Sequence, residues 1–436
     1  MINRLLYIYY LALILVLALY TNMNSSPNMM IRFGYLTAMI IPLVNRVEWF
    51  PAIIICALGI SKSTFAFPFM PTDMAYYVVL TLLFAFLAIY RRNLVLGVNP
   101  LFYFVFAYVA LNDYSMQGEL SQMSIMFFIS LLFYMCTVDD LDTACQLLPM
   151  SFIIISLTIS YWVIFCPEAQ IHSYNKTGDL EQTGWSDPNY LSTALGMGLV
   201  IAVRDLLHGD NKLPYTSFLS VTVLCSTISM LLLASRGAIL SVILTIALLF
   251  VISKTERRTK VIAVTVAAIF ILFLYTNKYI DFVMARIEAE DGTANHRTEI
   301  WQSKISDFFL IDNPLSWIFG VGQSEGFKLG KYLGRSLTGM STHNDILSVL
   351  IYYGFIGMCL FISVITYLLR VCRKADRPQI IALLAYLLIC SMTIEPLARG
   401  NFVYWGFLFY IFIYARHSQE LELMYEGEDE DFEEDF

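Results

Sequence analysis

The chain has 436 residues, of which 58% are hydrophobic and only 14% are charged. Ordinary soluble domains contain about 45 to 50% apolar and about 25% charged residues, so this composition excludes a water-soluble globular fold. The last thirteen residues carry eight acids, and the remaining 27 acids balance the 27 basic residues, so the net charge of −8 resides in the tail. The neutral body gives no reason to expect a nucleic-acid partner.

The apolar residues form blocks long enough to cross a bilayer, and they lack amphipathic spacing. The sequence therefore predicts an all-α polytopic transmembrane bundle of about 12 to 14 spans. No small-residue cleavage site follows the first block, so we expect a retained helix instead of a signal peptide. The blocks at 28–61 are either two spans or one span and a surface helix. Candidate spans lie near residues 2–20, 28–45, 47–61, 73–90, 95–111, 122–138, 147–166, 188–203, 215–234, 237–253, 260–276, 346–370, 378–395 and 401–415.

These spans predict five segments along the chain. Two sets of transmembrane helices come first. The longest polar segment follows as an outer loop with short surface helices, and the C-terminal helices come after it. The acidic end is expected to be a disordered cytoplasmic tail, or a docking peptide for a basic partner. The segments are residues 1–180, 181–276, 277–345, 346–416 and 417–436.

Lys and Arg gather in alternate loops, which the positive-inside rule assigns to the cytoplasm. Both termini are then expected to be cytoplasmic, and the loops at 167–186 and 277–345 lie on the outer face. The spans are almost free of Asp, Glu, His and Lys, which disfavours an ion-coupled transporter, because such proteins bury these residues as relays. The basic residues are Arg91, Arg92, Arg204, Lys212, Lys254, Arg257, Arg258, Lys260, Arg370, Arg373, Lys374, Arg377 and Arg416.

The eight cysteines show no CxxC spacing, and nearly all lie within or beside apolar blocks. We interpret them as small buried hydrophobic residues, and we expect no metal site and no cofactor. They are Cys56, Cys136, Cys145, Cys166, Cys225, Cys359, Cys372 and Cys390.

Arg236 is the only charged residue between Tyr215 and Ser253, a run about twice as long as one bilayer crossing. The chain must therefore turn at Ser235 to Gly237, which places Arg236 at the outer end of two helices. An arginine beside hydrocarbon costs on the order of 2.5 to 3.5 kcal/mol, so an anionic ligand is expected there. The alternative is an arginine that only anchors the turn in the interface.

Residues 278–288 and 297–309 of the outer loop carry apolar residues at helical spacing, which predicts helices on the membrane surface. Arg297 begins the second of them, after His296, which we interpret as a surface histidine. Gly320 and Gly322 form a turn in which a ligand could approach the backbone, although a plain loop turn explains the pair as well.

His343 stands directly before the span that begins at Ile346, where the helix N-terminus favours an anion. An imidazole at this place could accept a proton from a sugar hydroxyl at neutral pH. The alternative is a capping cluster, in which Ser341, Thr342 or Asn344 binds the free amides and His343 takes no part.

These motifs follow one another in the order Asp187-Pro188-Asn189-Tyr190-Leu191, Ala234-Ser235-Arg236-Gly237-Ala238, His296-Arg297 with Trp301, Gly320 with Gly322, His343-Asn344-Asp345-Ile346-Leu347 and Tyr353-Gly354-Phe355-Ile356-Gly357. Together they resemble the O-antigen ligase and O-antigen polymerase superfamily over roughly residues 185–365. The first 180 residues match that superfamily only in hydropathy.

The resemblance implies a metal-independent membrane glycosyltransferase with a periplasmic or extracellular active site in a bacterial inner membrane. Such enzymes transfer a glycan from undecaprenyl diphosphate to an acceptor hydroxyl. Carried over by motif, Arg236 and Arg297 bind the diphosphate and His343 is the catalytic base, so that residues 181–276 belong to the catalytic half. Secondary candidates are Arg399, Asn189, Asn344, Gly320 and Gly322.

Three functions fit the sequence to different degrees. The leading hypothesis is a surface polysaccharide polymerase that acts on lipid-linked repeat units, with the bilayer, the donor, a glycan acceptor and a chain-length regulator or other assembly proteins as partners. A ligase that uses lipid A core as acceptor, or an oligosaccharyltransferase that uses protein, is the closest alternative. A transporter or flippase of lipid-linked sugars is the third.

Overall fold

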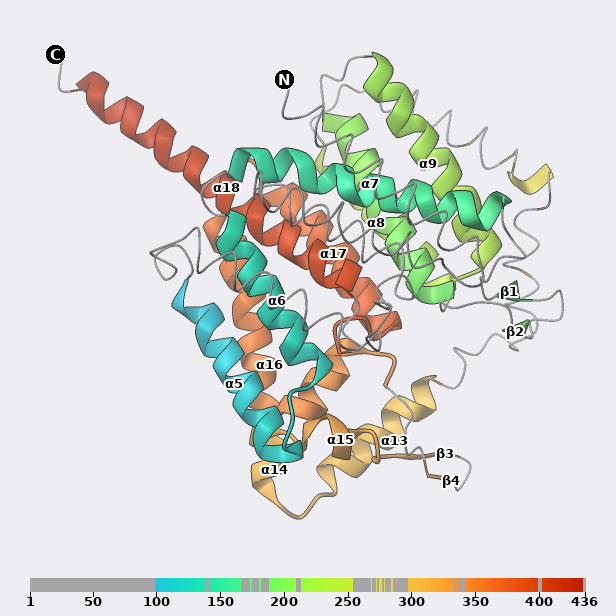
Figure 1. Ribbon diagram of the computed structural model, residues 1–436, viewed down its shortest axis with the longest axis vertical. Coiled ribbons are helices and arrows are strands. Elements are labelled where there is room, and N and C mark those ends of the chain that lie inside the picture. The colour runs from blue at the N-terminus through green and yellow to red at the C-terminus, as the bar shows by residue number, and fades with distance from the viewer. Residues whose placement is uncertain are drawn as a thin grey trace, which may run out of the picture. The chain divides into compact units, whose positions relative to one another are not determined.

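The fold is described from a computed structural model of the chain, which Figure 1 traces. The chain divides into two compact units, residues 1–82 with 146–293 and residues 83–145 with 294–436. The spans expected before residue 99 and most of the helix expected at 278–288 lie outside the described residues. The described residues are 99–137, 141–165, 173–174, 180–181, 188–208, 213–253, 268, 272, 274–276, 278, 284, 297–332, 335–336, 342–398 and 402–433.

Helix α8 is the most buried of the described helices in the first unit, and it packs against both α9 and α10. Small side chains allow α7 to approach it closely. A Cβ atom added at Gly198 would lie 2.4 Å from the Cβ of Ser156, whose hydroxyl donates to the Leu195 carbonyl at 3.0 Å. The elements here are α7 (Leu141–Phe165), which begins in the other unit, the pair β1 (Ser173–Tyr174) and β2 (Leu180–Glu181), α8 (Pro188–His208), α9 (Leu213–Leu233) and α10 (Arg236–Ile252).

Two side-chain contacts fix α8 and α9 as antiparallel neighbours. The Ser235 hydroxyl, just after α9, donates to Asn189 Oδ1 near the start of α8 at 2.9 Å. At the other end, the Tyr215 hydroxyl donates to Asp205 Oδ2 at 3.2 Å, and Asp205 also pairs with Arg204. A 21-residue helix is roughly 30 Å long, so the two contacts lie on opposite sides of a bilayer-sized layer.

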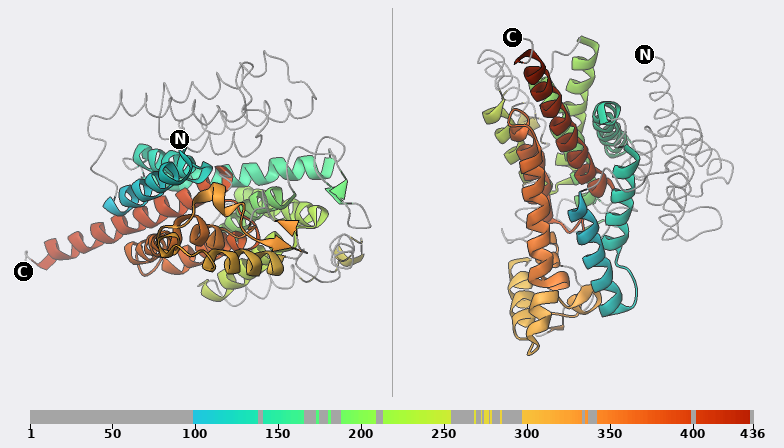
Figure 2. Two further views of the ribbon diagram at one scale, coloured as in Figure 1. Left: turned by 90° about the horizontal axis from the view of Figure 1, so that it is seen from below. Right: turned by 90° about the vertical axis from the view of Figure 1, so that its left-hand side faces the viewer.

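In the second unit, three short helices gather at one end of the long helices, as the right-hand view of Figure 2 shows. The long helices pack through aromatic rings, such as Phe102 on Phe412 at 5.0 Å and Phe127 on Trp405 at 5.9 Å between ring centroids. The elements are α5 (Pro100–Gln117), α6 (Gln122–Thr137), α13 (Arg297–Phe309), α14 (Pro314–Phe319), α15 (Gly322–Gly326), β3 (Lys331–Tyr332), β4 (Arg335–Ser336), α16 (Asp345–Val371), α17 (Arg377–Thr393) and α18 (Phe402–Glu433).

Helix α16 is kinked at Gly354, whose φ of +64° is accessible to glycine without a steric cost. The kink lets the backbone of α16 meet the loop between α14 and α15. A Cβ atom at Gly320 would lie 2.2 Å from the Tyr352 carbonyl oxygen, and one at Gly354 would lie 2.4 Å from the Ile318 carbonyl oxygen. The Val321 amide donates to the α16 backbone at 2.9 Å. The short helices are therefore fixed onto the first half of α16.

Arg373 lies at the opposite end of the second unit, in the loop between α16 and α17. The Arg373 amide donates to the Ser418 hydroxyl at 3.0 Å, and that hydroxyl donates to Asp376 at 2.7 Å. This contact joins the loop after α16 to α18. Since His343 precedes α16 and Arg373 follows its 27 residues, the two lie roughly 40 Å apart along the helix.

The described residues confirm the all-α class that the sequence predicts, apart from the two pairs of two-residue strands. Within the described ranges, four helices are long and apolar enough to cross a membrane, and three shorter apolar ones accompany them. The break predicted at Ser235 to Gly237 lies one residue earlier, at Ala234 and Ser235. The long helices are Ala144–Phe165, Pro188–Leu207, Leu213–Leu233 and Asp345–Val371, and the shorter ones are Gln122–Leu132, Arg236–Ile252 and Arg377–Thr393.

The acidic tail corrects one expectation. Helix α18 continues to Glu433, and its last turns project beyond the other helices of its unit (Figure 1), so the disorder predicted from residue 417 is wrong over that range. Residues 419–424 are mostly Glu, Leu, Gln and Met, which are strong helix formers. Arg416 also pairs with Glu420 one turn later at 3.5 Å.

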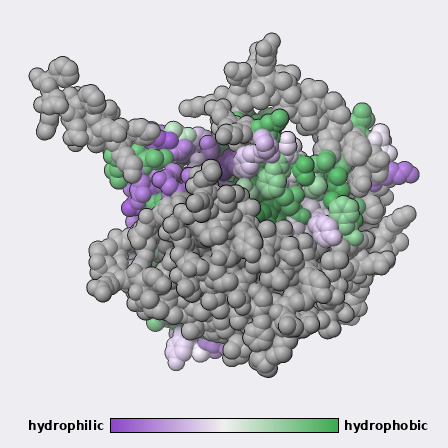
Figure 3. Space-filling model, turned by 45° about the horizontal axis from the view of Figure 1, so that its top comes forward, coloured by the Kyte–Doolittle hydropathy of each residue, from purple (hydrophilic) through white to green (hydrophobic). Residues whose placement is uncertain are grey.

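Large apolar side chains cover much of the exposed surface of the described helices. Leu213 and Val251 are each 79% exposed, and Leu111 is 69% exposed. Figure 3 shows such residues in green on one face. Monomeric soluble proteins rarely expose wide apolar surfaces, whereas lipid-facing helices must do so. The surface agrees with the composition in assigning the chain to a membrane.

Candidate active site

Arg236 lies at a helix start that two distant motifs build together. Ala234 takes a left-handed conformation, with φ of +51°, and ends α9. Ser235 is fully buried, and its hydroxyl bond to Asn189 joins residues that are 46 positions apart. The structure therefore brings the Asn189 motif and the Arg236 motif to one end of the first unit.

Two sources of positive charge meet at this end of the first unit. The first amides of a helix carry a partial positive charge, and an arginine in the same turn adds a full one. A basic side chain at that position opposes the helix dipole, so an anion bound there would stabilise both. Arg236 is half-buried, which leaves part of its side chain exposed. The arrangement is suited to a phosphate group that meets backbone amides and a guanidinium together.

His343 lies in a tight turn before α16 in the second unit. Its φ of +51° is costly for a residue with a Cβ atom, on the order of 1 to 2 kcal/mol. The turn is fixed on both sides: the Trp301 indole donates to the Thr342 carbonyl at 2.6 Å, and the Leu347 amide donates to Asn344 Oδ1 at 3.1 Å. Strain of this kind persists only where the surroundings enforce it.

The capping cluster considered as an alternative for His343 is present. Asn344 is the N-cap of α16, and its own amide donates to the Thr342 hydroxyl at 3.2 Å. These bonds explain Thr342 and Asn344, while Ser341 lies outside the described residues. Capping and a catalytic histidine are compatible, because the cap leaves His343 half-buried at the mouth of the helix.

A buried acidic group beneath this turn was not identified by sequence reasoning. Glu395 is 1% exposed, and its Oε1 accepts hydrogen bonds from Thr342 at 3.0 Å, from Tyr352 at 3.2 Å and from the Ser348 hydroxyl. Asp345 is fully buried, and its carboxylate accepts from the amides of Leu397 and Ala398. The two acids tie the loop after α17 to the start of α16.

Lys304 of α13 was also missed. Its side chain is fully buried, and Nζ donates to the Gly326 carbonyl at 3.0 Å. Burial lowers the pKa of this ammonium to about 8, while the nearby carboxylates of Glu395 and Asp307 oppose that shift. A lysine three residues before an acid in an amphipathic helix looks like a surface residue in the sequence, so only its tertiary surroundings distinguish it.

Arg297 begins α13, and its Nη1 donates to the carbonyl of Thr393, the last residue of α17. The loop of residues 393–398, which we call the 393–398 loop, therefore contacts Arg297 through its first residue. The same loop contacts the His343 turn through Glu395, Leu397 and Ala398. The structure thus attaches two of the predicted site residues to one loop.

The other predicted site residues fall into three groups: glycines explained by packing, residues outside the described ranges, and residues that belong to different units. Gly320 and Gly322 face protein atoms: a Cβ atom at Gly320 would strike the backbone of α16, and one at Gly322 would lie 2.7 Å from the Cβ of Met116. Packing therefore accounts for both glycines. Arg399 and His296 lie outside the described residues. Arg236 and Asn189 belong to the first unit, and Arg297 and His343 belong to the second.

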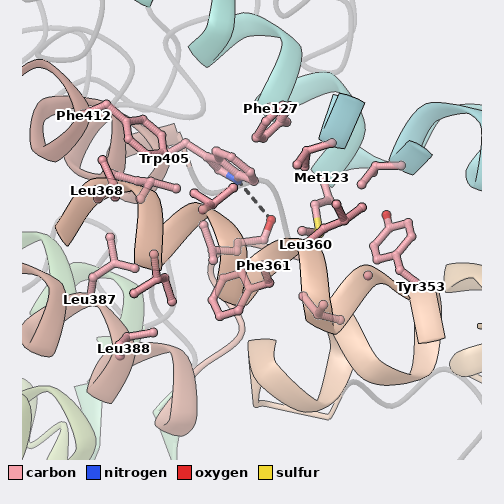
Figure 4. Close-up of a pocket in the computed structure, with 18 of the residues that line it drawn as sticks. Met123, Phe127, Tyr353, Leu360, Phe361, Leu368, Leu387, Leu388, Trp405 and Phe412 are labelled. Atoms are coloured by element: carbon pink, nitrogen blue, oxygen red, sulfur yellow. Dashed lines mark hydrogen bonds between the residues drawn. The ribbon is translucent and has the colours of Figure 1, made fainter. Parts of the chain in front are cut away.

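An apolar cavity lies in the second unit among α5, α6, α16, α17 and α18. Figure 4 shows its lining, which includes Phe127, Leu360, Phe361 and Phe412. The Trp405 indole at its edge donates to the carbonyl of Leu397, in the 393–398 loop, at 3.1 Å. Almost no polar atom lines the cavity, so it offers nothing to bind a sugar or a phosphate.

Comparison with known proteins bears on the segment that holds these residues. Residues 221–362 match the family model described as O-antigen ligase. This range includes Arg236, Arg297 and His343 together with the short helices and the kinked half of α16. A search of curated proteins finds no match to the chain. The matched range thus holds the three predicted site residues, and the resemblance of the chain to the O-antigen ligase and O-antigen polymerase superfamily is confirmed over residues 221–362.

Proposed function

We propose that the chain is a surface polysaccharide polymerase, a membrane glycosyltransferase that moves a glycan from undecaprenyl diphosphate to a sugar hydroxyl of an acceptor repeat unit. The observation that carries this proposal is the family match over residues 221–362, because it includes the cationic and imidazole residues at helix starts. Helices long and apolar enough to cross a membrane support the same class of enzyme.

In this proposal His343 is the general base. The acceptor hydroxyl gives its proton to the imidazole, and its oxygen forms a bond with the anomeric carbon of the donor glycan. The bond between that carbon and the diphosphate oxygen breaks, and its electron pair leaves with undecaprenyl diphosphate. Arg236 and Arg297 neutralise the charge that grows on this leaving group, a task that guanidinium groups perform well and that needs no metal. Asn189 supports the Arg236 turn through Ser235.

The proposed orientation places the chemistry on the periplasmic or extracellular side of a bacterial inner membrane, with both termini in the cytoplasm. The positive-inside rule supports it. Arg373 and Arg416 lie at the end of the second unit where Ser418 joins the loop after α16 to α18. His343 precedes the opposite end of α16. Donor, acceptor, bilayer and other assembly proteins such as a chain-length regulator are the proposed partners.

A ligase that transfers the same glycan to lipid A core is the second candidate, because the matching family model is described as O-antigen ligase. An oligosaccharyltransferase acting on protein belongs to the same class. The acceptor separates them, so the test supplies purified protein with a defined undecaprenyl-diphosphate-linked repeat unit alone. A ladder of longer lipid-linked chains supports the polymerase. No product until lipid A core or an acceptor protein is added contradicts it and supports the second candidate.

The positions and hydrogen bonds of the buried acids in the described helices disfavour a transporter or flippase. Asp113 lies near the end of α5, and its carboxylate accepts bonds from the Ser121 amide at 3.0 Å and the Tyr353 hydroxyl at 3.1 Å. Asp345 and Glu395 are likewise bonded to the chain at helix ends. These acids hold loops and helix starts, whereas proton relays and ion sites lie near mid-membrane.

A further inference from the structure

Glu395 holds three hydroxyl groups with one oxygen. Thr342 lies on the N-terminal side of His343, whereas Ser348 and Tyr352 lie one and two turns into α16. Because the three donors flank the His343 turn along the chain, a carboxylate bonded to all of them fixes the turn against the helix. The Thr342 and Ser348 hydroxyls also lie 2.6 Å apart, and the Thr342 hydroxyl is 2.9 Å from the Asn344 carbonyl oxygen, so its one proton is shared among these acceptors.

A counter-charge stabilises a buried carboxylate in addition to its hydrogen bonds, since removing an ion from water costs several kcal/mol per ion. The buried ammonium of Lys304 interacts electrostatically with Glu395, and Asp307 is the other acid that acts on it. Lys304 is held in place by the Gly326 carbonyl in α15. Through Trp301 and Lys304, α13 contacts both the His343 turn and α15, and the 393–398 loop contacts the same turn through Glu395.

We propose that Glu395, with Lys304 as its buried counter-charge, is the positioning residue that holds His343 in its left-handed conformation for proton transfer. The role of His343 rests on the proposed function, whereas the effect of Glu395 on the turn does not. Glu395 acts through Thr342 and α16. The strain at His343, whose φ is +51°, is then opposed by the three hydroxyl bonds and by the Trp301 bond to the Thr342 carbonyl.

The test compares Glu395→Gln with the parent protein in two measurements. The amide keeps the shape and one acceptor oxygen but loses the charge, so the turn should loosen while the helices persist. Hydrogen exchange of the peptide over residues 342–348 should speed up at least about tenfold, which corresponds to a local opening about 1.4 kcal/mol less costly. The transfer rate should fall roughly 100-fold with the donor KM unchanged, as expected for a misplaced base.

Two further variants separate a positioning role from a general loss of stability. Asp113→Asn removes another fully buried carboxylate of the same unit that also accepts from hydroxyl groups. It should leave exchange at residues 342–348 and the rate per folded molecule unchanged. Lys304→Met leaves Glu395 without its counter-charge, and adding Glu395→Gln to it should restore part of the lost rate, because no unpaired buried charge remains.

Unchanged exchange at residues 342–348 in Glu395→Gln would overturn the inference, and so would an equal effect of Asp113→Asn there. Because exchange does not depend on turnover, the two claims fail separately. A parent protein that transfers no glycan contradicts the proposed function, and the exchange comparison still decides whether Glu395 holds the turn. A parent that transfers glycan and a Glu395→Gln variant with the parent rate would contradict the positioning role.

Discussion

Replacing Gly320 by alanine tests how the short outer helices are held on α16. A Cβ atom at this position would lie 2.2 Å from the Tyr352 carbonyl oxygen and 2.5 Å from the Tyr353 amide nitrogen. Both are backbone atoms of a packed helix, so they cannot rotate away as a side chain could. Overpacking of this kind costs about 1 to 3 kcal/mol. The φ of +84° with ψ of −177°, a combination that is essentially restricted to glycine, adds about 1 to 3 kcal/mol for any residue with a Cβ atom.

Gly118 provides the matched control. Its φ of +74° and ψ of 0° lie in the left-handed region, which strains alanine less than the φ of +84° and ψ of −177° at Gly320, and a Cβ atom there meets nothing within 4 Å. Gly118→Ala should therefore lower the free energy of unfolding by about 1 to 2 kcal/mol. Gly320→Ala should lower it by about 2 to 6 kcal/mol, the sum of strain and overpacking. Chemical unfolding of the purified protein in detergent, followed by tryptophan fluorescence, measures both. Equal losses in the two variants would refute the reasoning.

Two further predictions concern charge. Arg236→Lys should raise the donor KM about tenfold, because an ammonium cannot form the paired bonds of a guanidinium to a diphosphate. Arg204→Lys, near the C-terminal end of α8, should leave the donor KM unchanged. Equal effects of the two substitutions in a transfer assay would contradict this prediction. The pKa of Lys304 is about 8 in the folded chain and near 10.5 in the unfolded chain. Between these pH values the unfolded chain binds more protons than the folded one. The contribution of Lys304 to the free energy of unfolding therefore rises with pH. Unfolding of parent and Lys304→Met from pH 8 to 10.5 should show this rise only in the parent, and parallel curves would refute it.

The sequence predicted the helices whose ends carry local signals. The predicted spans 346–370 and 378–395 lie within two residues of α16 and α17, because polar residues bound both apolar blocks. The expected span 95–111 is displaced from α5, which begins at Pro100 after the Asn99 cap and ends at Gly118. There the apolar block extends past a start signal that capping and proline chemistry determine.

The residues that support the site could not be predicted in the same way. Lys304 and Glu395 are 91 residues apart in the sequence, and no periodicity links them. The spacing of Gly320 and Gly322 suggested a ligand turn, but their role depends on where the kink at Gly354 places the backbone of α16. His343 was found because it stands at a helix start, whereas its strained φ is visible only in three dimensions. Local chemistry is readable from the sequence, and tertiary partners are not.

The decisive measurement of the proposed transfer reaction is the release of undecaprenyl diphosphate. Purified parent protein and His343→Ala are each reconstituted with a defined undecaprenyl-diphosphate-linked repeat unit, and the freed lipid diphosphate is quantified with the glycan products. The account predicts release with lengthening chains in the parent, and a loss of both in a His343→Ala variant that still inserts and folds. Release at the parent rate by that variant, or no release by the parent with any glycan acceptor, would contradict it.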